Sequence, residues 1–315
     1  MAFKKTSKNK TIKWANILIG IILLSCLSCF AVSIYVGLNL AMPKREPITN
    51  SPKNYGLSYE NVSFHSKYDD ILLKGWWIPA QNNGKHKESK KTIIFAHGYG
   101  DNRALMDIEI INIAKRLCNE GYNVLTFDFR AAGESEGKIV SLGEFEKYDL
   151  LTAVDFARNN KHSEKIGLVG WSMGAATSIL VGEMSKDVQA IVADSPFASL
   201  EGYLKANLPY WTHLPDFPFT NIILGVLPHI IGVDIADVNG LKAISNYKNK
   251  DLLLIHGKGD LTISYKESEK LYNIARKDEH VKLWITEKAE HIRTYKLYKK
   301  EYEKNILDFF HNSLK

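Results

Sequence analysis

The chain has 315 residues, enough for one α/β domain of about 250 residues, and its 45% hydrophobic and 24% charged residues are typical of a folded protein, not a disordered one. Its formal net charge is +6, but residues 1–13 contain five lysines and no acidic residue, which leaves 36 basic against 35 acidic residues elsewhere. Because the body is nearly neutral and carries no nucleic-acid-binding motif, we expect no nucleic-acid partner.

Residues 14–42 are predicted to form a transmembrane helix after a basic tail at residues 1–13. This run contains no charged residue, and about 20 apolar residues are enough to cross the hydrocarbon core of a bilayer. Lysines precede it, whereas Lys44 and Arg45 after it are partly offset by Glu46. The positive-inside rule therefore predicts a single-pass protein of the cell membrane, with the N-terminus in the cytoplasm and the body on the extracytoplasmic side.

Two alternatives to an uncleaved anchor are a cleaved signal peptide and lipoprotein-like processing at Cys26 or Cys29. The apolar region of a signal peptide is usually about 7–15 residues long and ends at a small-x-small site. Here the late candidate, residues 39–41 (Asn-Leu-Ala), fits that pattern poorly. Cys118 is the only cysteine of the body, so a disulfide within the body is excluded.

The body begins after a Pro- and Asn-rich linker at residues 43–58, and one α/β domain is predicted over residues 59–315. Strand-like runs lie at 60–65, 71–78, 92–96, 122–129, 165–170, 188–193, 251–256 and 281–285. Several of them are short and continuously apolar, which is typical of strands buried on both faces of a parallel sheet. Segments with helical periodicity lie at 104–120, 144–160, 173–185, 264–277 and 294–312. This alternation predicts a doubly wound, mostly parallel sheet of about eight strands with helices on both faces.

Residues 196–250 interrupt the alternation of strands and helices. The segment is rich in aromatic residues and prolines, and a structureless loop of this length is uncommon inside a compact domain. We expect a small helical cap inserted over the edge of the sheet. The alternative is a surface excursion without a role.

A candidate nucleophile lies in the motif Gly170-Trp171-Ser172-Met173-Gly174. It follows an apolar strand and precedes a helix of small residues, which is the context of the sharp strand-to-helix turn that exposes a serine hydroxyl above a sheet. A serine needs a base, and the base needs an acid that holds its tautomer. The alternative interpretation is a tight turn with a helix-capping serine.

The acid and the base are sought at the ends of later strands. Asp260 follows the strand at 251–256 in a glycine-rich turn, and His291 follows the last strand. The order Ser172, Asp260, His291 is that of the α/β-hydrolase triad. Asp194, at the end of the strand 188–193, is the rival acid, and His97 is expected to anchor its loop.

An acyl-transfer site also needs donors for the oxyanion. The backbone N–H of Met173, at the start of a helix, is one candidate, and the N–H of Tyr99 is the other because Gly98 and Gly100 allow the backbone to approach closely. The side chain of Tyr99 is alternatively a wall of the pocket.

Five motifs in this order resemble the α/β-hydrolase superfamily, in particular the membrane-anchored bacterial hydrolases of the Bem46 and serine-aminopeptidase-like groups. The resemblance covers about residues 60–312. The motifs are His97-Gly98-Tyr99-Gly100, Phe127-Asp128-Phe129-Arg130-Ala131-Ala132-Gly133-Glu134-Ser135, Gly170-Trp171-Ser172-Met173-Gly174, His256-Gly257-Lys258-Gly259-Asp260 and Glu290-His291. Ala131 replaces the first glycine of the family's Asp-x-Arg-Gly-x-Gly-x-Ser stretch, and the proline often found after the acid is absent. Both departures affect loops outside the triad.

The predicted function is that of a serine hydrolase cleaving carboxylic ester or thioester bonds, with a lipophilic acyl substrate indicated by the aromatic cap beside a membrane. A peptidase that releases N-terminal residues with the same triad is the first alternative. A non-catalytic, membrane-tethered binding protein is the second. Because the sequence has no zinc, Walker or dinucleotide motif, we expect no metal and no cofactor.

Overall fold

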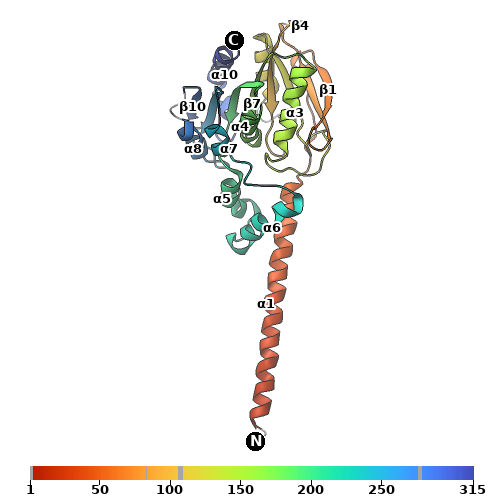
Figure 1. Ribbon diagram of the computed structural model, residues 1–315, viewed down its shortest axis with the longest axis vertical. Coiled ribbons are helices and arrows are strands. Elements are labelled where there is room, and N and C mark those ends of the chain that lie inside the picture. Colours follow the sequence, from red (N-terminus) through yellow and green to blue (C-terminus); the bar gives the residue numbers. More distant parts are fainter. Residues whose placement is uncertain (1–2, 83, 106–108, 276–278) are drawn as a thin grey trace. The chain divides into compact units, whose positions relative to one another are not determined.

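The structure is a computed structural model that describes residues 3–82, 84–105, 109–275 and 279–315. The chain divides into two compact units. The helical unit comprises the N-terminal helix up to Leu40 and residues 204–232, and the sheet unit comprises residues 41–203 and 233–315. Figure 1 draws both, coloured along the sequence.

The sheet unit is built on an eight-stranded sheet with the order β1-β2-β6-β5-β7-β8-β9-β10. The strands are β1 (Glu60–His65), β2 (Leu72–Ile78), β5 (Lys91–Ala96), β6 (Asn123–Phe127), β7 (Lys165–Trp171), β8 (Val188–Asp194), β9 (Asp251–Gly257) and β10 (Val281–Thr286). A separate hairpin joins β3 (Gln81–Asn82) to β4 (Lys85–His86). Within the main sheet, β2 pairs antiparallel with β1 and with β6, and the other neighbouring strands are parallel. This confirms the predicted mostly parallel sheet.

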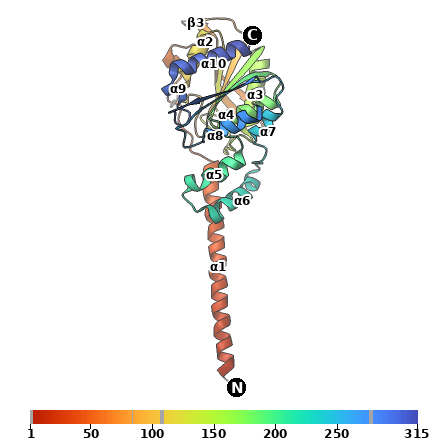
Figure 2. The same ribbon diagram turned by 90° about the vertical axis from the view of Figure 1, so that its left-hand side faces the viewer.

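Helices cover both faces of this sheet (Figure 2). One group is α2 (Ile110–Asn119), α9 (Thr294–Leu297) and α10 (Lys299–Ser313), and the other is α3 (Glu146–Asn159), α4 (Met173–Met184), α7 (Gly240–Ser245) and α8 (Lys266–Ala275). The two groups of helices pack on opposite faces of strand β7. An ideal Cβ on Gly167 would lie 2.6 Å from Phe310 of α10, whereas one on Gly170 would lie 2.2 Å from the carbonyl oxygen of Gly174 in α4. Positions three apart on a strand face opposite sides of the sheet.

Two predicted helices differ from the structure at their boundaries. The helix predicted over 104–120 begins at Ile110, because Glu109 has the left-handed φ of 55°. The helix predicted over 294–312 is divided at Tyr298, whose φ of −122° and ψ of 41° are not helical. Residues 106–108 and 276–277 of the predicted helices, like residues 1–2 of the basic tail, lie outside the described residues.

The predicted linker, residues 43–58, is packed into the sheet unit. It contains a 3₁₀ helix (Pro52–Tyr55), and Pro52 is buried. Leu57 is also buried and belongs to the main hydrophobic core. The side-chain amide of Asn102 donates to the carbonyl oxygen of Glu46 over 3.1 Å. These residues are therefore part of the domain that follows them.

The helical unit contains α1 (Phe3–Ala41), in which residues Ile12–Ala41 are long and apolar enough to cross a membrane. The aromatic segment at 196–250 is helical, as predicted, with α5 (Leu200–Thr212), a π-helix (Asp216–Thr220), α6 (Asn221–Ile231) and α7. Its middle part, residues 204–232, belongs to the helical unit, and its two flanks belong to the sheet unit. Leu208, Ile223 and Leu227 form a small core in this unit, to which Leu38 and Leu40 of α1 contribute.

Candidate active site

Ser172 occupies the turn between β7 and α4, with the positive φ of 54° that L-residues rarely adopt. The glycines on either side allow this turn. An ideal Cβ would lie 2.2 Å from the carbonyl oxygen of Gly174 if built on Gly170, and 2.0 Å from that of Ala96 if built on Gly174. Only glycine fits at both positions, so strand, helix and neighbouring strand meet closely enough to expose the serine.

The structure brings Ser172, His291 and Asp260 together at the carboxyl ends of three strands of the sheet. The Nε2 atom of His291 lies 2.9 Å from Ser172 Oγ, and its Nδ1 atom lies 2.7 Å from Asp260 Oδ2. Because the carboxylate can only accept, Nδ1 donates to Asp260, and Nε2 is then free to accept the serine proton. This is the arrangement of a nucleophile, a base and an orienting acid.

The carboxylate of Asp260 is buried and held by several donors. Its Oδ1 atom accepts hydrogen bonds from the backbone N–H groups of Thr262 and Ile263, at 2.9 and 2.8 Å. Burial raises the pKa of Asp260, but hydrogen bonds from His256, His291 and the Ile263 amide outweigh it and hold the pKa well below its usual value. Asp260 therefore stays ionised and fixes the tautomer of His291.

The loop after β5 lies against the candidate nucleophile. An ideal Cβ on Gly98 would lie 3.5 Å from the Cβ of Ser172, so the backbone of this loop approaches the serine directly. Tyr99 follows within the same loop, and Met173 begins α4, whose N-terminal N–H groups favour negative charge. A small pocket beside Gly98 and Met173 is also lined by Lys44 and Arg45.

His97 anchors this loop through hydrogen bonds to the backbone, as the sequence predicts. It is buried, and its Nδ1 atom donates to the carbonyl oxygen of Gly98 over 2.7 Å, while Nε2 accepts from the N–H of Phe129 over 3.0 Å. Burial lowers the pKa of His97 to about 4. The imidazole is therefore neutral, and it joins the loop after β5 to the loop after β6.

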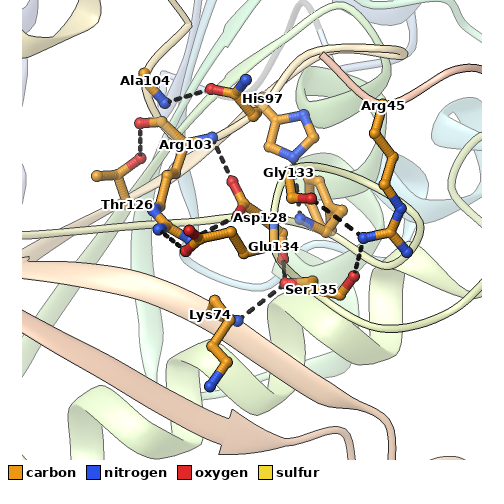
Figure 3. Close-up of polar contacts among 12 residues, drawn as sticks. Arg45, Lys74, His97, Arg103, Ala104, Thr126, Asp128, Gly133, Glu134 and Ser135 are labelled. Carbon is orange, nitrogen blue, oxygen red and sulfur yellow. Dashed lines mark hydrogen bonds and ion pairs between the residues drawn. The ribbon is translucent and has the colours of Figure 1, made fainter. Parts of the chain in front are cut away.

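A buried ion pair organises the loop after β6, residues 128–135 (Figure 3). Asp128 accepts hydrogen bonds from both the backbone and the guanidinium of Arg103, each at 2.7 Å, and from the N–H of Glu134 at 2.9 Å. Arg45 donates to the carbonyl oxygens of Gly133 and Ser135. The segment that follows α1 is thus hydrogen-bonded to a loop beside the candidate site.

Ala131, the residue that replaces a family glycine, has a φ of 58°. This is the left-handed conformation that glycine adopts without a steric penalty. The loop therefore keeps the backbone shape expected of a glycine although an alanine is present. Gly133 of the same loop leaves no room for a side chain, because an ideal Cβ there would lie 2.3 Å from Asp128 Oδ2.

The rival acid, Asp194, takes another position. Its carboxylate accepts a hydrogen bond from the Ser195 hydroxyl over 2.9 Å, whereas His291 Nδ1 donates to Asp260. Burial raises the pKa of Asp194 to about 6. The backbone of Asp194 helps to hold the turn at Ser172, because its carbonyl oxygen accepts a hydrogen bond from the N–H of Ser172 over 2.9 Å.

His256 is a site residue for which the sequence predicts no role. It is buried, with Nε2 at 3.2 Å from Asp260 Oδ2 and 2.8 Å from the carbonyl oxygen of Ile263, and Nδ1 at 2.7 Å from Ser268 Oγ. Both groups near Nε2 are acceptors, so Nε2 donates. Its position four residues before Asp260, at the end of the same strand, was the available signal.

Comparisons with known proteins bear on the family. Residues 87–230 match the family model of serine aminopeptidase, S33. The uncharacterized protein YqkD of Bacillus subtilis is 32% identical over 228 residues, which cover 71% of this chain and 72% of that protein. The Pyrococcus furiosus esterase Pf2001 has a similar structure, with a TM-score of 0.73 and 30% identity over 88% of this chain and 99% of that one. The chain belongs to the α/β-hydrolase superfamily.

Within this superfamily, lysophosphatidylserine lipase ABHD12 of Bos taurus is 27% identical over 247 residues, covering 71% of this chain and 58% of that protein. The α/β-hydrolase relatives with an activity in their names thus include an esterase and a lipase, and the chain is an enzyme of the hydrolase class. The family-model match includes Ser172 but ends before Asp260 and His291.

Proposed function

We propose that this α/β-hydrolase is a serine hydrolase that cleaves carboxylic ester or thioester bonds through an acyl-enzyme on Ser172. The observation that carries the proposal is the continuous hydrogen-bonded chain from Ser172 Oγ through His291 to Asp260, with distances of 2.9 and 2.7 Å. Nucleophile and base lie within hydrogen-bond reach, and the base is oriented by a third group.

In the first half of the reaction, Ser172 Oγ attacks the carbonyl carbon of the substrate and its proton passes to His291 Nε2. Asp260, ionised by its hydrogen bonds, stabilises the imidazolium that forms. The negative charge on the carbonyl oxygen is held by the backbone N–H groups of Met173 and Tyr99. His291 then protonates the leaving alkoxide or thiolate, and the acyl group stays on the serine.

In the second half, water attacks the acyl-enzyme. His291 Nε2 takes a proton from the water and returns it to Ser172 Oγ as the acid leaves, which restores the starting state. The neutral state of His97 is suited to holding the loop that contains Tyr99, because Nδ1 donates to the Gly98 carbonyl of that loop while Nε2 accepts from the Phe129 N–H of the loop after β6.

The substrate class is a lipophilic acyl ester or thioester. The names of an esterase and a lipase among the relatives support an ester bond. The aromatic and apolar composition of residues 196–250 supports a lipophilic acyl group. The family-model name favours a second candidate, a serine aminopeptidase with the same triad.

The enzyme is anchored by residues 14–42, which remain uncleaved, with residues 1–13 in the cytoplasm and residues 59–315 outside it. Among the described residues, Ile12–Ala41 is the one unbroken helix long and apolar enough to cross a membrane, which supports a span there, and the lysines before it support the orientation. The bilayer and a small-molecule ester are the proposed partners.

Turnover by the full chain in detergent micelles tests the reaction class. Esters and thioesters of graded acyl length are compared with aminoacyl amides, and Ser172→Ala is the control. We expect ester turnover that increases with acyl length and is lost in Ser172→Ala. Turnover of aminoacyl amides alone would establish the peptidase instead, and no turnover of either class would support a binding protein.

A further inference from the structure

We propose that residues 204–232, the hairpin of α5 and α6, form a surface that contacts the lipid bilayer beside α1. The inference concerns a binding surface rather than the reaction, and it rests on the proposed role of α1 as the membrane anchor. Its first support is composition. Between residues 206 and 232, Asp216 is the only Asp, Glu, Lys or Arg.

The hairpin packs on α1 within one compact unit (Figures 1 and 2). Ser33 and Gly37, one turn apart on α1, are buried, and small residues at this spacing let membrane helices approach closely. An ideal Cβ on Gly37 would lie 2.6 Å from Leu227 and 3.6 Å from Ile223 of α6. The hairpin is thus joined to the helix that is proposed to cross the bilayer.

The contact with α1 places the hairpin at one surface of the membrane. The apolar run of α1 has 30 residues, about 45 Å at 1.5 Å per residue, whereas the hydrocarbon core is about 30 Å thick. The residues of α1 that contact the hairpin, Gly37, Leu38 and Leu40, lie at the C-terminal end of this run. The hairpin therefore lies at the depth where the acyl chains meet the headgroups.

The side chains that the hairpin leaves uncovered are large and apolar. Tyr210, Phe217 and Ile230 are 72%, 78% and 54% exposed. Residues 204–232 carry few charged side chains, Lys205 and Asp216, and aromatic and apolar side chains on such a segment are typical of elements that lie in a membrane interface. Its two arms together are as apolar as a membrane span but are bent by 115°. Such a hairpin fits a membrane surface better than a straight crossing.

Nitroxide labels on the full chain in phosphatidylcholine–phosphatidylglycerol vesicles test the proposal, in a background with Cys26 and Cys29 replaced by Ser. Labels are placed at Ile230→Cys in α6 and Ile274→Cys in α8, since these isoleucines are 54% and 52% exposed. We expect oxygen, which partitions into lipid, to relax the Ile230 label several-fold more than a water-soluble nickel complex, with the reverse at Ile274. Equal access of the nickel complex to both labels would overturn the proposal. Protection of Ile230 from both reagents would also overturn it, because a protein partner would then cover the hairpin.

A pair of glycine substitutions tests the role of α1. Gly37→Leu would collide with Leu227, whereas an ideal Cβ on Gly20 meets nothing within 4 Å. We expect Gly37→Leu, but not Gly20→Leu, to move the Ile230 label towards the nickel complex. Unchanged accessibility in Gly37→Leu would count against the proposed packing. Neither readout needs turnover, so failure here is distinguishable from failure of the proposed hydrolase reaction.

Discussion

Replacement of Asp260 by asparagine separates the role of its charge from that of its shape. The backbone N–H groups of Thr262 and Ile263 both point at Oδ1, so the amide oxygen of asparagine takes that position. The amide NH₂ group then faces His291 Nδ1, where the carboxylate oxygen lay at 2.7 Å. Because NH₂ can only donate, Nδ1 must accept, and the proton of His291 moves to Nε2.

This tautomer cannot accept the proton of Ser172. In a serine protease, the corresponding substitution lowers kcat by about ten-thousand-fold with the geometry intact. At about 1.4 kcal/mol for each factor of ten, the expected loss of transition-state stabilisation is about 5 kcal/mol. The fold is expected to stay intact, because asparagine fills the same volume and keeps the two backbone hydrogen bonds at Oδ1.

The assay is kcat for a soluble p-nitrophenyl ester, with Asp194→Asn as the matched control. Asp194 is a buried aspartate whose carboxylate accepts a hydrogen bond from the Ser195 hydroxyl, so its amide variant is expected to retain turnover within about tenfold of wild type, the equivalent of about 1.4 kcal/mol. A large loss in Asp194→Asn together with a small loss in Asp260→Asn would show that Asp194, and not Asp260, is the acid that orients His291.

Two further predictions concern the loops beside the site. Because burial lowers the pKa of His97 to about 4 from an unfolded value of about 6.5, the unfolded state binds the extra proton first as pH falls. The contribution of neutral His97 to the free energy of unfolding is therefore fully present above about pH 6.5. It is lost as the pH falls towards about 4, by up to about 3 kcal/mol. Urea unfolding of the full chain in detergent at several pH values measures this, and His97→Gln should lose less; equal losses would contradict it. Ala131→Gly should raise the unfolding free energy by up to about 1 kcal/mol by relieving left-handed strain, whereas Gly133→Ala, directed at the Asp128 carboxylate, should lower it by about 2 kcal/mol or more. A shift of both variants in the same direction would show that the loop is not constrained as described.

The centre of the sheet could be predicted because β5, β6, β7, β8 and β9 are short, largely apolar and almost wholly buried, which is a local signal. The same holds for Ser172, whose flanking glycines mark the turn, and for Asp260 and His291, each at the end of an apolar strand. The geometry that joins these three depends on the order of strands in the sheet. The order of strands in the sheet could be expected only through the family resemblance, which rests on the order of the motifs along the chain.

The remaining differences depend on contacts between distant residues. The left-handed φ of Glu109 and the helix break at Tyr298 do not occur at a glycine or a proline, so the sequence does not predict them. Residues 43–58 have the composition of a linker, yet buried Leu57 packs them into the sheet unit. The sequence shows only that His256 lies at the end of a strand, and its contact with Asp260 becomes clear from the distance in the structure.

Covalent labelling tests the proposed mechanism most directly. A fluorophosphonate reacts with a serine only when a base activates it, and peptide mapping of the labelled full chain identifies the residue. We expect one labelled peptide, carrying Ser172, with labelling lost in Ser172→Ala and strongly slowed in His291→Ala. Labelling of a different serine, or none at Ser172 in folded protein, would contradict the assignment of Ser172 as the nucleophile.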